Sequence, residues 1–227
     1  MEQSRRDPIK ARSCKLILEA TDPATECTVQ EAKFEVDTVS ELCNMIGIDQ
    51  RELEHGGEYL LNPEEVSLIT KRFNVDFFPG SMCTRLRSRS ALDDLPYQVH
   101  TGRELKLMLE GTKPLAYFYE EYPASSKSKD IPEDLFDQHV AAGRFVKREH
   151  VLIDKASERH SKRVVLYALP GQEWRIEAFL LLLDTAAKTG WNPGFERMEG
   201  SLLGYEEWQN DIFMEQIYAA RERTGSK

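Results

Sequence analysis

The residues best placed for chemistry surround the start of a helix that the sequence predicts over 172–189. Arg175 lies in the first turn of this helix, and Pro170 and Gly171 join it to a preceding strand. A helix start presents unpaired N–H groups that bind anions, and a guanidinium can hold a carboxylate or phosphate through two parallel hydrogen bonds. Gly171 and Arg175 are therefore candidate ligands for a small anion.

Four further residues extend this candidate ligand-binding site. Tyr119 and Glu121 lie on an aromatic-rich predicted strand and would face the anion. Trp191 and Tyr205 follow the helix and would form a wall, because Trp and Tyr combine a large apolar area with a polar tip. The competing interpretation is plain helix capping, since Glu173 in the first turn already complements the helix dipole without a ligand.

Familiar catalytic motifs are absent from the sequence, so no catalytic residue is assigned. There is no HExxH, HxH, GxSxG, GxxxxGK[ST] or GxGxxG. His100, beside Thr101, is the most interesting of the five histidines, because a helix start would lower its pKa. A local turn or capping role explains His100 more simply.

No metal site and no cofactor are expected. The four cysteines are far apart in the sequence and form no CxxC pair, so the simplest interpretation is reduced, mostly buried thiols: Cys14, Cys27, Cys43 and Cys83. A helical di-iron site would need Glu-x-x-His on two helices, whereas this chain has one such tetrapeptide, from Glu52 to His55, followed by two glycines.

The elements that must position these residues divide into two predicted domains. Residues 14–78 read as a small α+β domain, because alternating runs at 14–20 and 28–36 predict a hairpin and two capped amphipathic helices follow it. Asn62 and Pro63 mark the start of the second helix.

Residues 79–97 are expected to form a linker, because Pro, Gly and Ser interrupt them and no helical period is present. Arg85, Arg87 and Arg89 recur at period two, so an extended chain would point all three the same way. They are read as solvated linker residues, with a phosphate-contacting or partner-contacting arm as the alternative. Whether the segment is a free linker or a domain interface stays open.

Residues 98–218 are expected to form the larger domain. Two extended runs, at 145–153 and 162–169, suit an antiparallel hairpin because the polar loop 154–161 is too short for a parallel crossover. The helix at 172–189 is apolar almost all round, which predicts a central helix covered on most sides. The expected fold class is α+β: a small N-terminal ββα-type domain, and a C-terminal domain with a short, mostly antiparallel sheet packed on several helices.

The composition limits the partners. A formal net charge of -9 argues against nucleic acid or an anionic membrane as the partner, because both are negatively charged and would be repelled. No apolar run is longer than six residues, as at 178–183, whereas a membrane-spanning helix needs about 20. The first 13 residues lack the apolar stretch of a secretory signal, so a cytoplasmic protein is expected. Residues 1–95 hold 12 Lys and Arg against 18 Asp and Glu, which would suit a cationic partner.

These observations favour a cytosolic binding or regulatory protein, such as an inhibitor, an immunity-type protein or an adaptor, that meets a protein partner through an acidic, aromatic surface. The alternative is an enzyme or sensor that binds a small anionic ligand at the helix start at 170–175. The sequence leaves the partner's identity and the oligomeric state open.

Overall fold

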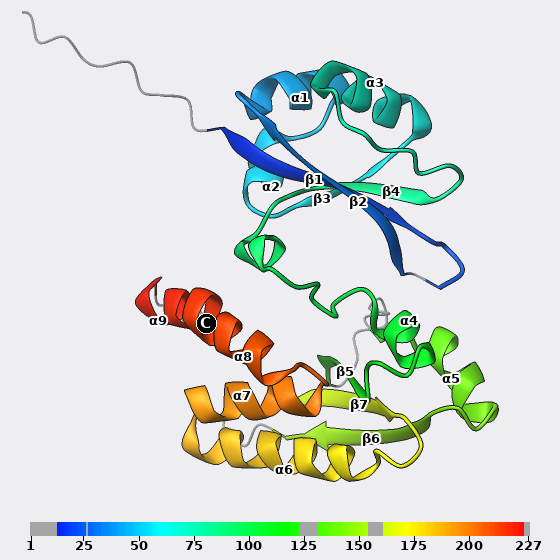
Figure 1. Cartoon of the computed structure of the whole chain (residues 1–227), viewed down its shortest axis with the longest axis vertical. Coiled ribbons are helices and arrows are strands. Elements are labelled where there is room, and N and C mark those ends of the chain that lie inside the picture. Colours follow the sequence, from blue (N-terminus) through cyan, green and yellow to red (C-terminus); the bar gives the residue numbers. More distant parts are fainter. Residues whose placement is uncertain (1–12, 26, 123–130, 154–160, 225–227) are drawn as a thin grey trace, which may run out of the picture. The chain divides into compact units, whose positions relative to one another are not determined.

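A computed structural model describes residues 13–25, 27–122, 131–153 and 161–224 of the chain (Figure 1). The chain divides into two compact units, one ending at Asp93 and the other starting at Asp94, and each unit has its own sheet and core. Both sheets are antiparallel and packed against helices, so the predicted α+β class is confirmed.

The first unit is built on a four-stranded sheet. Its strand order is β2-β1-β4-β3, with β1 at Cys14–Thr21, β2 at Thr28–Val36, β3 at Glu58–Leu61 and β4 at Cys83–Ser88. The predicted hairpin is confirmed, because β1 and β2 pair antiparallel with Leu16 opposite Phe34.

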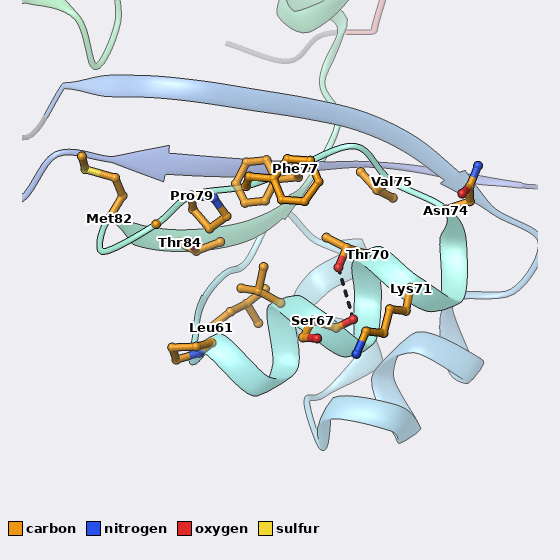
Figure 2. Close-up of a pocket in the computed structure, with 14 residues that line it drawn as sticks. Leu61, Ser67, Thr70, Lys71, Asn74, Val75, Phe77, Pro79, Met82 and Thr84 are labelled. Carbon is orange, nitrogen blue, oxygen red and sulfur yellow. Dashed lines mark hydrogen bonds between the residues drawn. The ribbon is translucent and has the colours of Figure 1, made fainter.

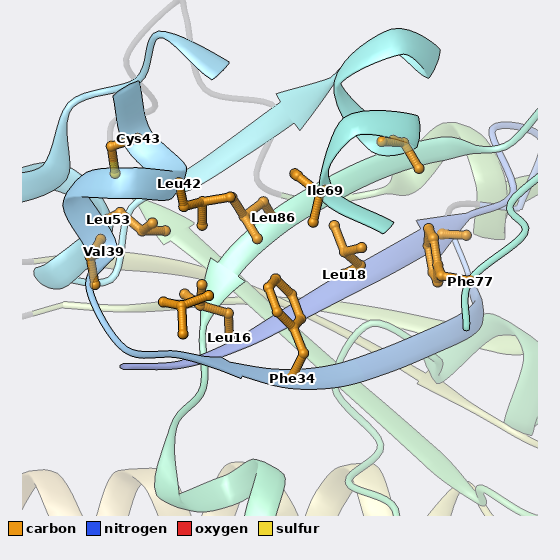
Figure 3. Packing of buried hydrophobic residues seen from close by; sticks show 13 residues of the cluster. Leu16, Leu18, Phe34, Val39, Leu42, Cys43, Leu53, Ile69, Phe77 and Leu86 are labelled. Atoms are coloured by element: carbon orange, nitrogen blue, oxygen red, sulfur yellow. The ribbon is translucent and has the colours of Figure 1, made fainter. Parts of the chain in front are cut away.

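Three helices supply the other half of this unit's core. They are α1 at Val39–Ile46, α2 at Gln50–Glu54 and α3 at Pro63–Phe73, and a 3-10 turn, η1, follows the sheet at Ala91–Asp94. Figure 3 shows Leu16, Leu18 and Leu86 of the strands facing Leu42 and Ile69 of the helices, and all five are fully buried.

Strand β4 corrects the expected linker over 79–97. Residues 83–88 pair antiparallel with β1 on one side and β3 on the other, so they lie inside the sheet. The alternation has a structural reason: Thr84 and Leu86 are buried on the helix-covered side, while Arg85 and Arg87 take the opposite face. Arg85 and Arg87 in β4, with Arg89 just after it, made a strand inside the sheet look like a solvated segment.

The second unit contains a three-stranded sheet of order β5-β7-β6. These strands are β5 at Leu115–Glu121, β6 at Val146–Leu152 and β7 at Lys162–Ala168. The predicted antiparallel hairpin of β6 and β7 is confirmed. The polar loop expected between them lies outside the described residues, apart from its last residue, Ser161.

The helices of this unit are α4 at Glu104–Leu109, α5 at Glu133–Ala141, α6 at Trp174–Thr189, α7 at Pro193–Leu202, α8 at Glu207–Phe213 and α9 at Ala219–Thr224, with a π-helical turn, η3, at Met214–Tyr218. Helices α5 and α6 pack on opposite faces of the sheet. Phe179 of α6 packs with Leu166 on one face. On the other, the rings of Phe136 in α5 and Tyr167 in β7 have centroids 4.7 Å apart.

Helix α6 differs from the expected central helix. Its buried side chains are Ile176, Phe179 and Leu182, whereas Trp174 is 57% exposed and Leu181 is 67% exposed. A run of consecutive leucines points to every side of a helix, but the sheet and α7 cover one side of it. The apolar run predicted a helix correctly and overstated how much of it is covered.

Candidate functional site

A pocket of about 760 Å³ lies in the first unit between α3 and the segment 74–82 (Figure 2). In Figure 2 the side chains of Val75, Phe77 and Pro79 lie along one side of it and those of α3 along the other. The lining is largely apolar and includes Leu61, Val66, Val75, Phe77, Pro79 and Met82. Pockets of this size and character are typical of binding sites.

The end of α3 explains why a hollow forms here. The helix ends at Asn74, whose positive φ of 52° is the left-handed conformation that reverses a chain, and Asn tolerates this conformation better than most residues. The chain then runs back beside α3 as far as Gly80, where φ is 60° and a second turn leads into β4. Phe77 is 2% exposed and anchors this returning segment in the core.

Large apolar side chains lie exposed in the pocket lining and on neighbouring elements. Phe78 lines the pocket and is 82% exposed, and Met82 is 36% exposed. Leu68 of α3 and Leu60 of the edge strand β3 are also exposed. Burying one such side chain releases about 1.5–3 kcal/mol, so a group of them is typical of an interaction surface.

Charge is unevenly distributed near the pocket. Lys71 contributes a positive charge to the lining from the last turn of α3. Exposed Glu64 follows Pro63 in the first turn, and exposed Asp76 lies between the lining residues Val75 and Phe77. Glu64 and Asp76 are thus exposed carboxylates adjacent in sequence to lining residues, and Lys71 is a lining ammonium group near the end of α3.

The sequence drew no attention to this pocket. Its residues come from a helix, a returning loop and two strands, and their proximity depends on the pairing of β3 with β4. A partial signal was present in the segment from Asn74 to Gly80, because two consecutive phenylalanines before Pro-Gly are unusual in a polar loop.

The anion site predicted at the start of α6 has its groups engaged in local contacts. The Arg175 guanidinium donates to the carbonyl oxygens of Ser201 and Leu202 at 2.8 and 3.0 Å, and to Gln172 Oε1 at 2.7 Å. It thereby caps the carbonyl end of α7. The backbone N–H groups of Glu173 and Gly171 hold the pKa of the Glu173 carboxyl below its ordinary value.

The other predicted site residues make contacts of their own. Tyr119 and Glu121 are exposed on β5, and the Lys162 ammonium lies over the Tyr119 ring. Trp191 donates its indole N–H to Glu196, and the Tyr205 ring stacks on His100. These contacts do not bring the residues together around Arg175, and the anion site remains a prediction.

Comparisons of the chain with protein-family models, curated proteins and solved structures found no significant match. Within the described residues, no helix is long and apolar enough to cross a membrane. In that same part of the chain, no group of three or more His, Cys, Asp or Glu side chains is arranged to hold a metal ion.

Proposed function

We propose that this chain is a binding or regulatory protein that holds an apolar segment of a protein partner in the pocket of its first unit. The observation that carries the proposal is Phe78, a side chain 82% exposed to solvent at a largely apolar pocket of about 760 Å³. A large exposed aromatic beside a preformed hollow has the character of an interface anchor.

The partner's segment is expected to be apolar with basic residues beside its anchor. Glu64 and Asp76 are exposed next to lining residues, and residues 1–95 hold 18 acidic against 12 basic side chains. Opposite charges around an apolar contact speed association and orient the partner. Because Glu64 lies in the first turn of α3 whereas Lys71 lies in its last turn, the basic residues are expected nearer Leu61 and Pro63.

The proposal can be tested by selecting random linear peptides on the immobilised full-length chain. Enriched peptides are expected to contain a large apolar residue close to Lys or Arg. Phe78→Ala should then weaken the best peptide by at least about tenfold, as truncation of an interface anchor does. Phe78 is so exposed that this variant should keep the thermal stability of the parent.

Leu181→Ala is the matched control, because Leu181 is a large apolar side chain, 67% exposed, on α6 of the second unit. It should leave the peptide affinity unchanged. The proposal fails if no peptide is enriched over a blank surface, or if the selected peptides bind the parent and Phe78→Ala equally well.

A further inference from the structure

One wall of the pocket in the first unit carries polar side chains. Ser67, Lys71 and Asn74 line it from α3 and its C-cap, at spacings of four and three residues that place neighbouring side chains on one side of a helix. Figure 2 shows Ser67 and Lys71 on the helix, whereas Phe77 and Pro79 come from the returning segment. The pocket therefore has a polar wall as well as an apolar one.

The polar groups of this wall are not engaged by the rest of the first unit. Among the residues that the structure describes, no side chain or backbone group forms a hydrogen bond or ion pair with the Lys71 ammonium, the Ser67 hydroxyl or the Asn74 carboxamide. Arg72, the next residue in the same turn, pairs instead with Glu41. Lys71 is thus a positive charge at a largely apolar pocket, and it is available to a ligand.

The chemistry of this wall suits a carboxylate. The Lys71 ammonium has three hydrogen-bond donors and no acceptor, and the Ser67 hydroxyl and the Asn74 amide nitrogen can also donate. Donors beside one positive charge match an anion with a single negative charge. A phosphate group carries about two negative charges and is typically bound by a cluster of arginines, which this wall does not have.

The apolar surface around the pocket favours a polypeptide as the occupant. Phe78 and Met82 of the lining and Leu68 of α3 expose large apolar side chains to solvent. A segment of several residues can cover these side chains and also fill the pocket, whereas a small molecule would fill the pocket alone.

We propose, building on the partner binding proposed above, that the partner's segment carries an Asp or Glu side chain that pairs with Lys71 while its apolar anchor fills the pocket. Exposed Glu64 lies seven positions before Lys71, two turns and roughly 10 Å away on the same side of α3. The segment then has its basic residue toward Glu64 and its acidic residue toward Lys71. Opposite charges at the two ends of α3 fix the direction in which the segment lies.

The first test uses the best peptide selected on the full-length chain, acetylated and amidated so that its ends carry no charge. Enriched peptides are expected to hold Asp or Glu on the side of the apolar anchor away from Lys or Arg. Replacing that acid by its amide should weaken binding to the unchanged chain about two- to fivefold, the size expected of an exposed ion pair.

A charge reversal then identifies Lys71 as the group that meets the acid. Lys71→Glu should weaken the selected peptide by at least about fivefold, and a peptide whose acid is replaced by Lys should recover most of this loss on the variant. Arg72→Glu is the matched control, because it changes the charge equally in the same turn but does not line the pocket. It should alter either affinity less than about twofold. Both side chains are exposed, so both variants should fold.

The outcomes separate this pairing from the partner site itself. The pairing with Lys71 is overturned if the enriched peptides lack an acid, if amidation of the C-terminus abolishes binding, or if Lys71→Glu and Arg72→Glu weaken the peptide equally. The partner site survives those results as long as Phe78→Ala still weakens binding. If no peptide is enriched, or Phe78→Ala has no effect, the proposed function fails and the pairing fails with it.

Discussion

The guanidinium of Arg87 joins two carboxylates on the face of the first sheet that the helices leave uncovered. It donates to Glu19 at 2.6 Å and to both carboxylate oxygens of Asp93 at 2.8 Å, and its side chain is 19% exposed. An arginine read from the sequence as a solvated linker residue is thus the centre of a half-buried ion-pair network. Removing it would leave two poorly hydrated carboxylates without their cation.

Arg87→Ala is therefore expected to lower the free energy of unfolding of the first unit by about 2 kcal/mol, because breaking a partly buried pair strands its partners. Arg85→Ala, at a half-buried position two residues away on the same face, should cost less, about 1 kcal/mol. Urea unfolding followed by far-UV circular dichroism measures both variants. Equal losses for the two would show that the ion-pair network does not stabilise the unit.

The same ion-pair network predicts that the first unit loses stability as the pH falls into the acid range. Burial opposes ionisation of Asp93, but hydrogen bonds from Arg87 and Ser90 outweigh it and lower the Asp93 pKa to about 2. A depressed pKa means that the stabilisation is complete above the ordinary value of 3.8 and is lost as pH falls from there to about 2. In Asp93→Asn this loss should shrink, which acid unfolding of parent and variant compares directly.

At the scale of elements, the α7–α8 corner, residues 203–206, depends on a glycine that no other residue can replace without strain. Gly204 has φ of 94°, and a Cβ at this position would lie 2.3 Å from Pro114 Cδ. Gly143 also has a positive φ, 70°, but a Cβ there would meet no atom within 4 Å. The two glycines share the backbone requirement and differ in the space around them.

Gly204→Ala should consequently destabilise the second unit by about 3 kcal/mol or more, through both positive φ and overlap with Pro114. Gly143→Ala should cost about 1 kcal/mol, through positive φ alone. Tryptophan fluorescence during urea unfolding measures both, because Trp174, Trp191 and Trp208 all lie in this unit. A Gly204→Ala cost no larger than that of Gly143→Ala would contradict the close approach to Pro114.

The local elements were the most predictable part of the structure. The capping box of Asn62 with Glu65 and the Pro at the start of α3 are short-range signals, and α3 forms where they place it. Strand β4 was missed because its place in the sheet depends on pairing Leu18 with Leu86, 68 positions apart. Local sequence patterns do not reveal such long-range pairings, and here charged residues alternate with the buried ones in β4.

The candidate sites show the same limit. Tyr205 was singled out for its aromatic character, and it does take part in a cluster, but the cluster forms around Lys113 and His100. Lys113 in a polar stretch after Gly111 looks like an ordinary surface lysine. Its burial follows from the folding of the α7–α8 corner against it, which is a contact between positions 90 residues apart.

At the scale of the whole molecule, the two units are expected to fold independently, because each holds a separate sheet and core. A chain of residues 94–227 should unfold cooperatively in urea with a sigmoidal tryptophan transition, and a chain of residues 13–93 should do so by circular dichroism. A gradual change without a transition in either piece would show that the unit needs the rest of the chain.

The central claim is that a partner segment binds in the pocket of the first unit. Nuclear magnetic resonance of the ¹⁵N-labelled full chain, titrated with the best selected peptide, locates the binding site residue by residue. Chemical-shift changes are expected to be concentrated in α3 and the segment 74–82, with the amides near Phe78 changing most. The same titration of Phe78→Ala should give much smaller shifts at equal peptide concentration. Changes centred on α6 and the exposed Leu181, or shifts that persist undiminished in Phe78→Ala, would contradict that claim.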